Sequence, residues 1–79
     1  MLIRSQDKTI IVNIDNAFSI AIQDINGATT IYVGSQGACY IIAEYSTKAK
    51  AMKVLDMIQE AYVNGHIDYQ MPADSEVVV

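Results

Sequence analysis

The fold depends on one stretch of the chain, which reads Ser46-Thr-Lys-Ala-Lys-Ala-Met-Lys-Val-Leu-Asp-Met-Ile-Gln-Glu-Ala-Tyr-Val-Asn-Gly65. A hydroxyl at its start can cap free N–H groups, and Asn64-Gly65 is a common helix stop. At about 100° per residue, apolar side chains gather on one side of this stretch and polar ones lie opposite. We therefore predict an amphipathic helix over Thr47–Asn64, within the segment 46–65. Its apolar side comprises Ala51, Val54, Leu55, Ile58, Ala61 and Tyr62, and its polar side comprises Lys53, Asp56, Glu60 and Asn64.

The chain before this helix, residues 1–45, has the pattern of short strands and turns. A short apolar start, Leu2–Arg4, is followed by the β-branched run Thr9–Ile14, and Ala17–Gln23 alternates apolar and polar residues. Asn26-Gly27 is the strongest hairpin signal. Thr29–Val33 follows this turn as the partner strand, and Gly34–Gly37 is the next turn. The strand after it, Ala38–Tyr45, is apolar on both faces until Glu44. That pattern is typical of a central strand, or of one whose second face another subunit covers.

The segment after the helix, residues 66–79, is interpreted as a closing strand and a tail. Ile67, Tyr69 and Met71 alternate with polar residues, and Pro72 ends the strand because proline cannot donate to a ladder. The apolar end Val77–Val79 requires something to hold it, either a sheet edge or a neighbouring chain.

These elements predict one α+β domain spanning residues 1–79. Its sheet is a small antiparallel meander of four to five strands packed on one helix in the C-terminal half, with a short strand after the helix. The register leaves open whether Ile10 and Val12, or instead Ile11, face the helix, because a slip of one residue exchanges the faces. The predicted core is Ile3, Ile10, Val12, Phe18, Ile20, Ile22, Ile31, Val33, Ile41, Val54, Leu55, Ile58 and Tyr62.

Size and composition favour self-association. A chain of 79 residues buries only about 60% of its unfolded surface, so its core is marginal. It has one cysteine, which rules out an intrachain disulfide, and no paired Cys/His motif for zinc. The remaining sources of stability are a well-packed core and association with further copies. A hydrophobic fraction of 52% favours association.

The charge balance argues against nucleic acid and membranes as partners. Five Lys/Arg face nine Asp/Glu, for a net charge of −4, whereas nucleic-acid modules usually carry a basic stripe.

No apolar run approaches the roughly 18–20 residues of a membrane span, and the start lacks the layout of a secretion signal. We therefore expect a cytoplasmic location. A nucleic-acid role would need the basic residues Arg4, Lys8, Lys48 and Lys50 to cluster.

No catalytic, cofactor or metal site is predicted. Cys39 and His66 are the only thiol and imidazole, so they form the one possible nucleophilic pair. Cys39 lies inside an apolar strand, where we expect a buried small hydrophobe. His66 follows the helix, where a cap is the simpler role. Asp56 and Glu60 lie four residues apart, but two carboxylates on a solvated helix face are weak evidence for a metal.

The tyrosines indicate a possible interface. Tyr32 and Tyr40 lie on neighbouring strands and could share a sheet face with Ile42 beside them. If that face lies away from the helix, it invites a partner, because tyrosine suits interfaces. Met52 and Val63 fall outside the apolar side of the helix. They are either lone exposed apolar residues or part of a subunit contact.

Two runs of the sequence carry a family resemblance. They are Ile3-Arg-Ser-Gln-Asp-Lys8 and Glu44-Tyr-Ser-Thr-Lys48, the second continued by Val54-Leu-Asp56. Together they resemble a group of short, uncharacterised proteins of Gram-positive bacteria that are often associated with phage or mobile elements. Ala49 departs from that pattern, in which Glu is expected, so a capping box with Ser46 is absent. The resemblance implies no activity and no site.

The resulting functional prediction is a non-enzymatic small domain that self-associates, as a homodimer or higher homo-oligomer, or that binds a protein partner. The alternative is a regulatory or nucleic-acid-associated accessory domain. A patch of basic residues would favour the alternative, and an exposed apolar surface would favour the first prediction.

Overall fold

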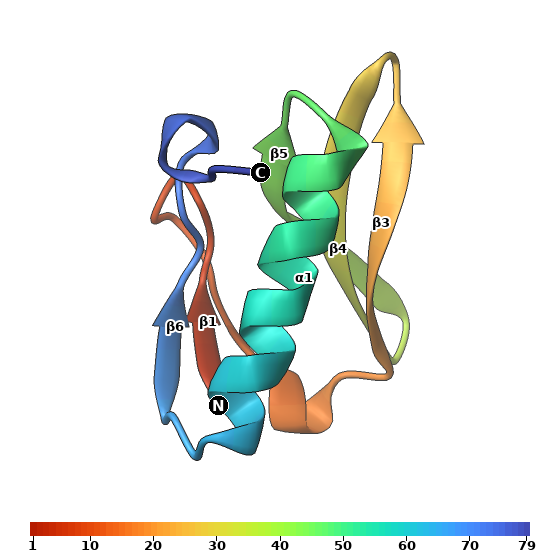
Figure 1. The fold of residues 1–79 in the computed structure, drawn as a ribbon. Coiled ribbons are helices and arrows are strands. Elements are labelled where there is room, and N and C mark those ends of the chain that lie inside the picture. Colours follow the sequence, from red (N-terminus) through yellow and green to blue (C-terminus); the bar gives the residue numbers. More distant parts are fainter.

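The computed structural model describes all 79 residues of the chain. One α-helix lies between two small sheets (Figure 1), which confirms the predicted α+β class. The elements in chain order are β1 (Leu2–Arg4), β2 (Ile11–Asn13), a 3-10 turn η1 (Ile14–Asn16), β3 (Ser19–Ile25), β4 (Ala28–Ser35), β5 (Ala38–Tyr45), α1 (Lys48–Val63), β6 (Asp68–Gln70) and a second 3-10 turn η2 (Asp74–Glu76).

The strands divide into two three-stranded sheets rather than one continuous meander. β3, β4 and β5 form an antiparallel sheet through two tight hairpins, and α1 packs on all three strands. The second sheet has the order β2-β1-β6, in which β1 pairs antiparallel with β2 but parallel with β6. The helix thus connects β5 of the first sheet to β6 of the second, and β6 pairs with the first strand of the chain.

The helix ends where its capping residues predict. The Thr47 hydroxyl accepts a hydrogen bond from the Lys50 N–H at 3.2 Å. At the other end Gly65 has φ +78°, its N–H donates to the Tyr62 carbonyl, and the His66 N–H donates to the Ala61 carbonyl. These two bonds form a Schellman motif, which requires the left-handed backbone that glycine adopts without strain.

One cluster of thirteen buried apolar side chains joins both sheets to the helix. Ile3, Ile31, Val33, Val54 and Ile58 were predicted there and are all buried. Val12 pairs with Ile3 and faces inward, whereas Ile11 is exposed, so the open question of register resolves in favour of Ile10 and Val12. Of the other predicted core residues, Val12, Ile20 and Ile22 are half-buried and pack against this cluster, and Ile10 and Leu55 are half-buried.

A β-bulge in β5 overturns the predicted placement of Ile41. Ile31 pairs with Ala43 but the next residue, Tyr32, pairs with Ile41, so Ile42 is the extra residue. A bulge of one residue exchanges the faces of every residue beyond it. Ile42 is therefore buried in the core, and Ile41 lies exposed beside Tyr32 on the face away from the helix.

Phe18 and Tyr62 were also predicted in the core, and both are exposed. Phe18 precedes β3, and its N–H bonds the Gly34 carbonyl although the ladder pairs Gly34 with Ser19. The alternation that holds from Ile20 onward therefore does not extend back to Phe18. Tyr62 lies on the last turn of α1, opposite the turn η1 rather than a strand, and its side chain stays exposed.

The C-terminal tail is held by its own chain. Met71 and Val77 are buried in the core. The Asp74 carboxylate accepts hydrogen bonds from the N–H and the hydroxyl of Ser46 and from the Lys50 ammonium, at 2.8–3.4 Å. The Tyr45 hydroxyl donates to the Pro72 carbonyl at 2.8 Å, and burial, with Tyr69 and acidic groups nearby, raises the pKa of Tyr45. The start of the helix and the tail therefore lock each other in place.

Candidate functional site

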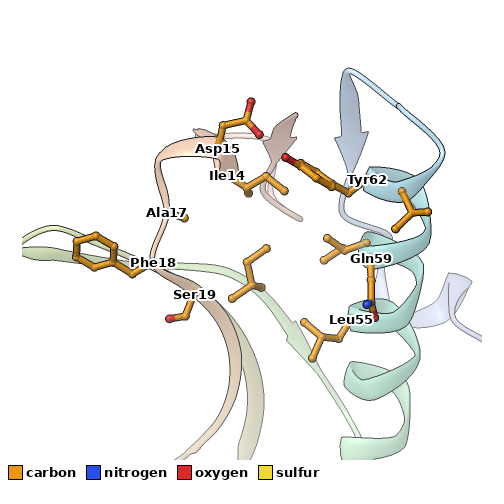
Figure 2. Close-up of a pocket in the computed structure, with 11 residues that line it drawn as sticks. Ile14, Asp15, Ala17, Phe18, Ser19, Leu55, Gln59 and Tyr62 are labelled. Atoms are coloured by element: carbon orange, nitrogen blue, oxygen red, sulfur yellow. The ribbon is translucent and has the colours of Figure 1, made fainter.

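The main apolar hollow of the molecule is a groove between α1 and the segment that leads into β3. It has a volume of about 530 Å³, and eight of its eleven lining residues are apolar. Figure 2 shows side chains from the second half of α1 on one side and from η1 and the start of β3 on the other. The residues that line this groove are Ile14, Asp15, Ala17, Phe18, Ser19, Ile20, Leu55, Ile58, Gln59, Tyr62 and Val63.

The spacing of apolar residues on α1 creates one wall of the groove. Leu55, Ile58 and Tyr62 recur every three or four residues and therefore line one side of the helix. Ile58 is buried and forms the floor, whereas Leu55 is half-buried and Tyr62 is exposed. The groove therefore lies beside the core, and Ile20 of β3, which packs on the core, also lines it.

The rim of the groove carries large exposed apolar side chains. Phe18 is 77% exposed, Val63 75% and Tyr62 53%. Figure 2 shows Tyr62 reaching across toward Ile14 and Asp15, whereas Phe18 projects from the opposite rim away from the helix. Single exposed apolar residues are ordinary, but several around one hollow mark an interaction surface.

The groove is almost free of unpaired charge. Its one ionisable carboxylate, Asp15, accepts a hydrogen bond from the N-terminal ammonium of Met1 at 3.1 Å. In a chain of net charge −4, this makes the groove one place where a second acidic surface could approach without strong repulsion.

Beside the groove, β3 forms an open edge of its sheet. β3 pairs only with β4, and no backbone hydrogen bond joins its outer side to any other segment. Its sequence, Ser-Ile-Ala-Ile-Gln-Asp-Ile, contains no lysine or proline and a single charge, Asp24. Natural proteins usually protect such an edge with charges, proline or a covering loop. The α1/β3 surface, defined as the groove together with the open edge of β3, therefore combines two features of a binding site.

The opposite edge of the same sheet is β5, and the loop between β1 and β2 covers part of it. The Gln6 N–H donates to the Ile42 carbonyl at 2.7 Å. The Gln6 side-chain amide accepts from the Glu44 N–H at 3.0 Å and donates to the Glu44 carbonyl at 3.1 Å. The β1–β2 loop thus substitutes for a neighbouring strand beside Ile42 and Glu44 of β5, whereas no segment bonds the outer side of β3.

The predicted interface residues do not form one surface. Tyr32 pairs with Ile41, and Tyr40 pairs with Val33, so the bulge places Tyr32 and Tyr40 on opposite faces of the sheet. Their predicted common face is therefore wrong, and Ile42, at 2% exposure, cannot contribute to an external contact. Met52 is exposed on α1 but lies outside the groove lining. Among the predicted interface residues, Val63 is the one that lines the groove.

The structure corrects the prediction for Cys39. This thiol is exposed, because Cys39 pairs with Gly34 on the face of the sheet away from the helix. No hydrogen bond joins it to His66, whose backbone N–H belongs to the helix stop. Asp56 and Glu60 are exposed on α1, and no group of three or more potential metal ligands gathers anywhere in the chain.

Of the four basic residues that a nucleic-acid role would need, Arg4 and Lys50 make hydrogen bonds to other parts of the chain. The Lys50 ammonium bonds the carboxylate and the carbonyl of Asp74. The Arg4 guanidinium donates to the Lys8 carbonyl at 3.3 Å, which places these two residues together at the β1–β2 loop. No further observation favours a nucleic-acid interface.

The groove is not predicted from the sequence, because strand alternation and helical periodicity place two of its lining residues, Phe18 and Tyr62, in the core. A usable signal was present at the end of α1, where the adjacent apolar residues Tyr62 and Val63 cannot both face the same layer. The sequence does not show that β3 is an edge strand, because the order of strands in a sheet is set by tertiary pairing.

No protein-family model, curated protein or solved structure matches the chain. The resemblance of Ile3–Lys8 and Glu44–Lys48 to phage-associated proteins stays a prediction. None of the helices is long and apolar enough to cross a membrane.

Proposed function

We propose that this chain is a non-enzymatic protein-binding domain that uses the α1/β3 surface. The observation that carries the proposal is one apolar groove with Tyr62 and Val63, each more than half exposed, along its helix side. Exposed apolar surface of this kind is unfavourable in water and is retained where a partner covers it.

The shape of the surface indicates the kind of ligand. The groove accepts an apolar side chain, and the free edge of β3 offers backbone N–H and C=O groups to an extended strand. Strand addition gives affinity through the backbone, while a neighbouring pocket selects the side chain. The ligand class supported best is therefore an extended protein segment that presents apolar side chains on one face.

A small probe tests the groove directly. N-acetyl-L-phenylalaninamide, titrated into dilute labelled protein, should shift the amide resonances of Ile20, Leu55 and Tyr62 in a saturable way. Val63→Lys, at the rim, should weaken this binding. Ile67→Lys is the matched control, because Ile67 is 83% exposed but lies outside the groove. Shifts that are absent, or scattered over the whole surface, would contradict the proposal.

A further inference from the structure

We propose that the partner is a second copy of this chain, bound by antiparallel pairing of the two β3 edges about a twofold axis. This inference rests on the proposed function, because it names the occupant of the same surface. Three observations carry it: the unequal treatment of the two sheet edges, the distribution of charge, and the area that a stable contact needs.

The two edges of the β3-β4-β5 sheet differ in whether another segment bonds them. Backbone and side-chain bonds from Gln6 cover the second half of the β5 edge, at Ile42 and Glu44, and a bulge at Ile42 makes the strand irregular. The β3 edge has neither a covering residue nor a bulge. An edge of seven residues without lysine or proline is a template for another strand. Because the N–H and C=O groups of an antiparallel pair satisfy each other reciprocally, β3 can pair with its own copy.

The charge distribution favours an acidic partner such as this chain itself. Asp15 is paired with the N-terminal ammonium, and Asp24 accepts a hydrogen bond from the Thr29 hydroxyl at 3.0 Å. No unpaired carboxylate is left in the groove to attract a basic partner. Two chains of net charge −4 repel each other, so contact through this region, where Asp24 is the one carboxylate without an ion pair, is less unfavourable than contact between more acidic surfaces.

The area requirement favours a folded partner over a short peptide. A typical stable interface buries about 800 Å² of each partner, which is about a sixth of the 4964 Å² that this chain exposes. The groove alone is too small, so the contact must include the β3 edge and the adjoining side of α1. Edge pairing achieves this, because it places both helices on the same side of a joined six-stranded sheet.

The joined sheet leaves a defined space between the two helices. Since α1 packs over β3, β4 and β5, the helices of the two copies would be separated by three strand spacings, about 14 Å. Helices in contact lie 8–10 Å apart, so longer side chains must fill the remaining space. Leu55, Gln59 and Tyr62 project from α1 on that side and are the residues available to fill it.

Charge substitution on the edge tests the pairing. Ser19 and Gln23 are exposed positions of β3, and a Ser19→Lys/Gln23→Lys variant places lysines where two edges would meet. Sedimentation equilibrium should show a wild-type dimer at micromolar concentration and at least a tenfold larger dissociation constant for this variant. The control, Ser75→Lys/Gln36→Lys, makes the same changes at exposed turn positions and should sediment as the wild type.

Single cysteine substitutions along β3 should locate the twofold axis between the two copies. In a Cys39→Ser background, Ser19→Cys, Ala21→Cys and Gln23→Cys are oxidised separately, because antiparallel neighbours have the Cα spacing that a disulfide needs. One or more should crosslink to its own copy, whereas Ser75→Cys should not. A wild type that sediments as a monomer at all concentrations, or a dimer unaffected by the β3 lysines, would overturn the inference. If that monomer still binds N-acetyl-L-phenylalaninamide at the groove, the proposed function stands alone; without that binding, both fail.

Discussion

The side-chain amide of Gln6 pairs with both backbone groups of Glu44, accepting from its N–H at 3.0 Å and donating to its carbonyl at 3.1 Å. This contact satisfies both backbone groups of Glu44 at the end of β5 without a further strand. The same amide also donates to the Pro72 carbonyl at 3.2 Å, so one side chain joins the β1–β2 loop, the sheet and the tail. The contrast with the uncovered edge of β3 supports the proposed pairing of two copies through β3.

Removal of the Gln6 side chain should expose the β5 edge. Gln6→Ala loses two bonds to Glu44 and one to Pro72, while water replaces part of what is lost at this half-exposed site. We expect a loss of about 1–2 kcal/mol in the free energy of unfolding and faster exchange of the Glu44 amide. Gln36→Ala, at an exposed turn glutamine without a hydrogen bond, should change stability by less than about 0.5 kcal/mol. Equal effects of the two substitutions would refute the role of Gln6.

The bulge in β5 predicts opposite outcomes for two adjacent isoleucines. Ile42→Ala removes a side chain that is 2% exposed and should cost about 2–4 kcal/mol in urea unfolding. Ile41→Ala, at 51% exposure on the outer face, should cost less than about 1 kcal/mol. The reverse order would show that β5 continues without a bulge and that Ile41 faces the core.

Acid should weaken the fold through Asp7. Hydrogen bonds from the Ser5 hydroxyl, the Thr9 hydroxyl and the Thr9 N–H lower the pKa of Asp7 to about 2. Because this folded-state pKa lies below the ordinary value of 3.8, the unfolded chain binds more protons between them. The contribution of Asp7 is therefore complete above that ordinary value and is lost as the pH falls through about 2.

Urea unfolding between pH 7 and pH 2 measures this effect. Asp7→Asn should be less stable than the wild type at neutral pH, and the difference should shrink as the solution is acidified. Asp56→Asn serves as the control, because Asp56 is an exposed helix carboxylate without a side-chain hydrogen bond. A difference between wild type and Asp7→Asn that stays constant down to pH 2 would count against this account.

The sequence predicted the helix well because its signals are local. The capping hydroxyl of Thr47, the left-handed Gly65 and the apolar row through Val54 and Ile58 all act within a few residues of one another. Asn26-Gly27 likewise forms the predicted hairpin turn, with both residues at positive φ.

The errors arose where distant segments decide the structure. The bulge at Ile42 depends on the pairing of β5 with β4 and with the Gln6 loop, so alternation alone placed Ile41, Tyr40 and Cys39 on the wrong faces. The division into two sheets depends on β6 pairing with β1 across most of the chain. The groove was missed for the same reason, because its two walls come from separate parts of the sequence.

The most direct test of the central claim is amide hydrogen exchange at several protein concentrations. If copies pair through β3, the amides that point outward from Ser19–Ile25 should become protected as the concentration rises from micromolar to near millimolar. The Glu44 amide, already bonded to Gln6 within each chain, should exchange at a constant rate. Exchange of the β3 amides that stays fast and independent of concentration would contradict the claim that this edge is the contact between copies.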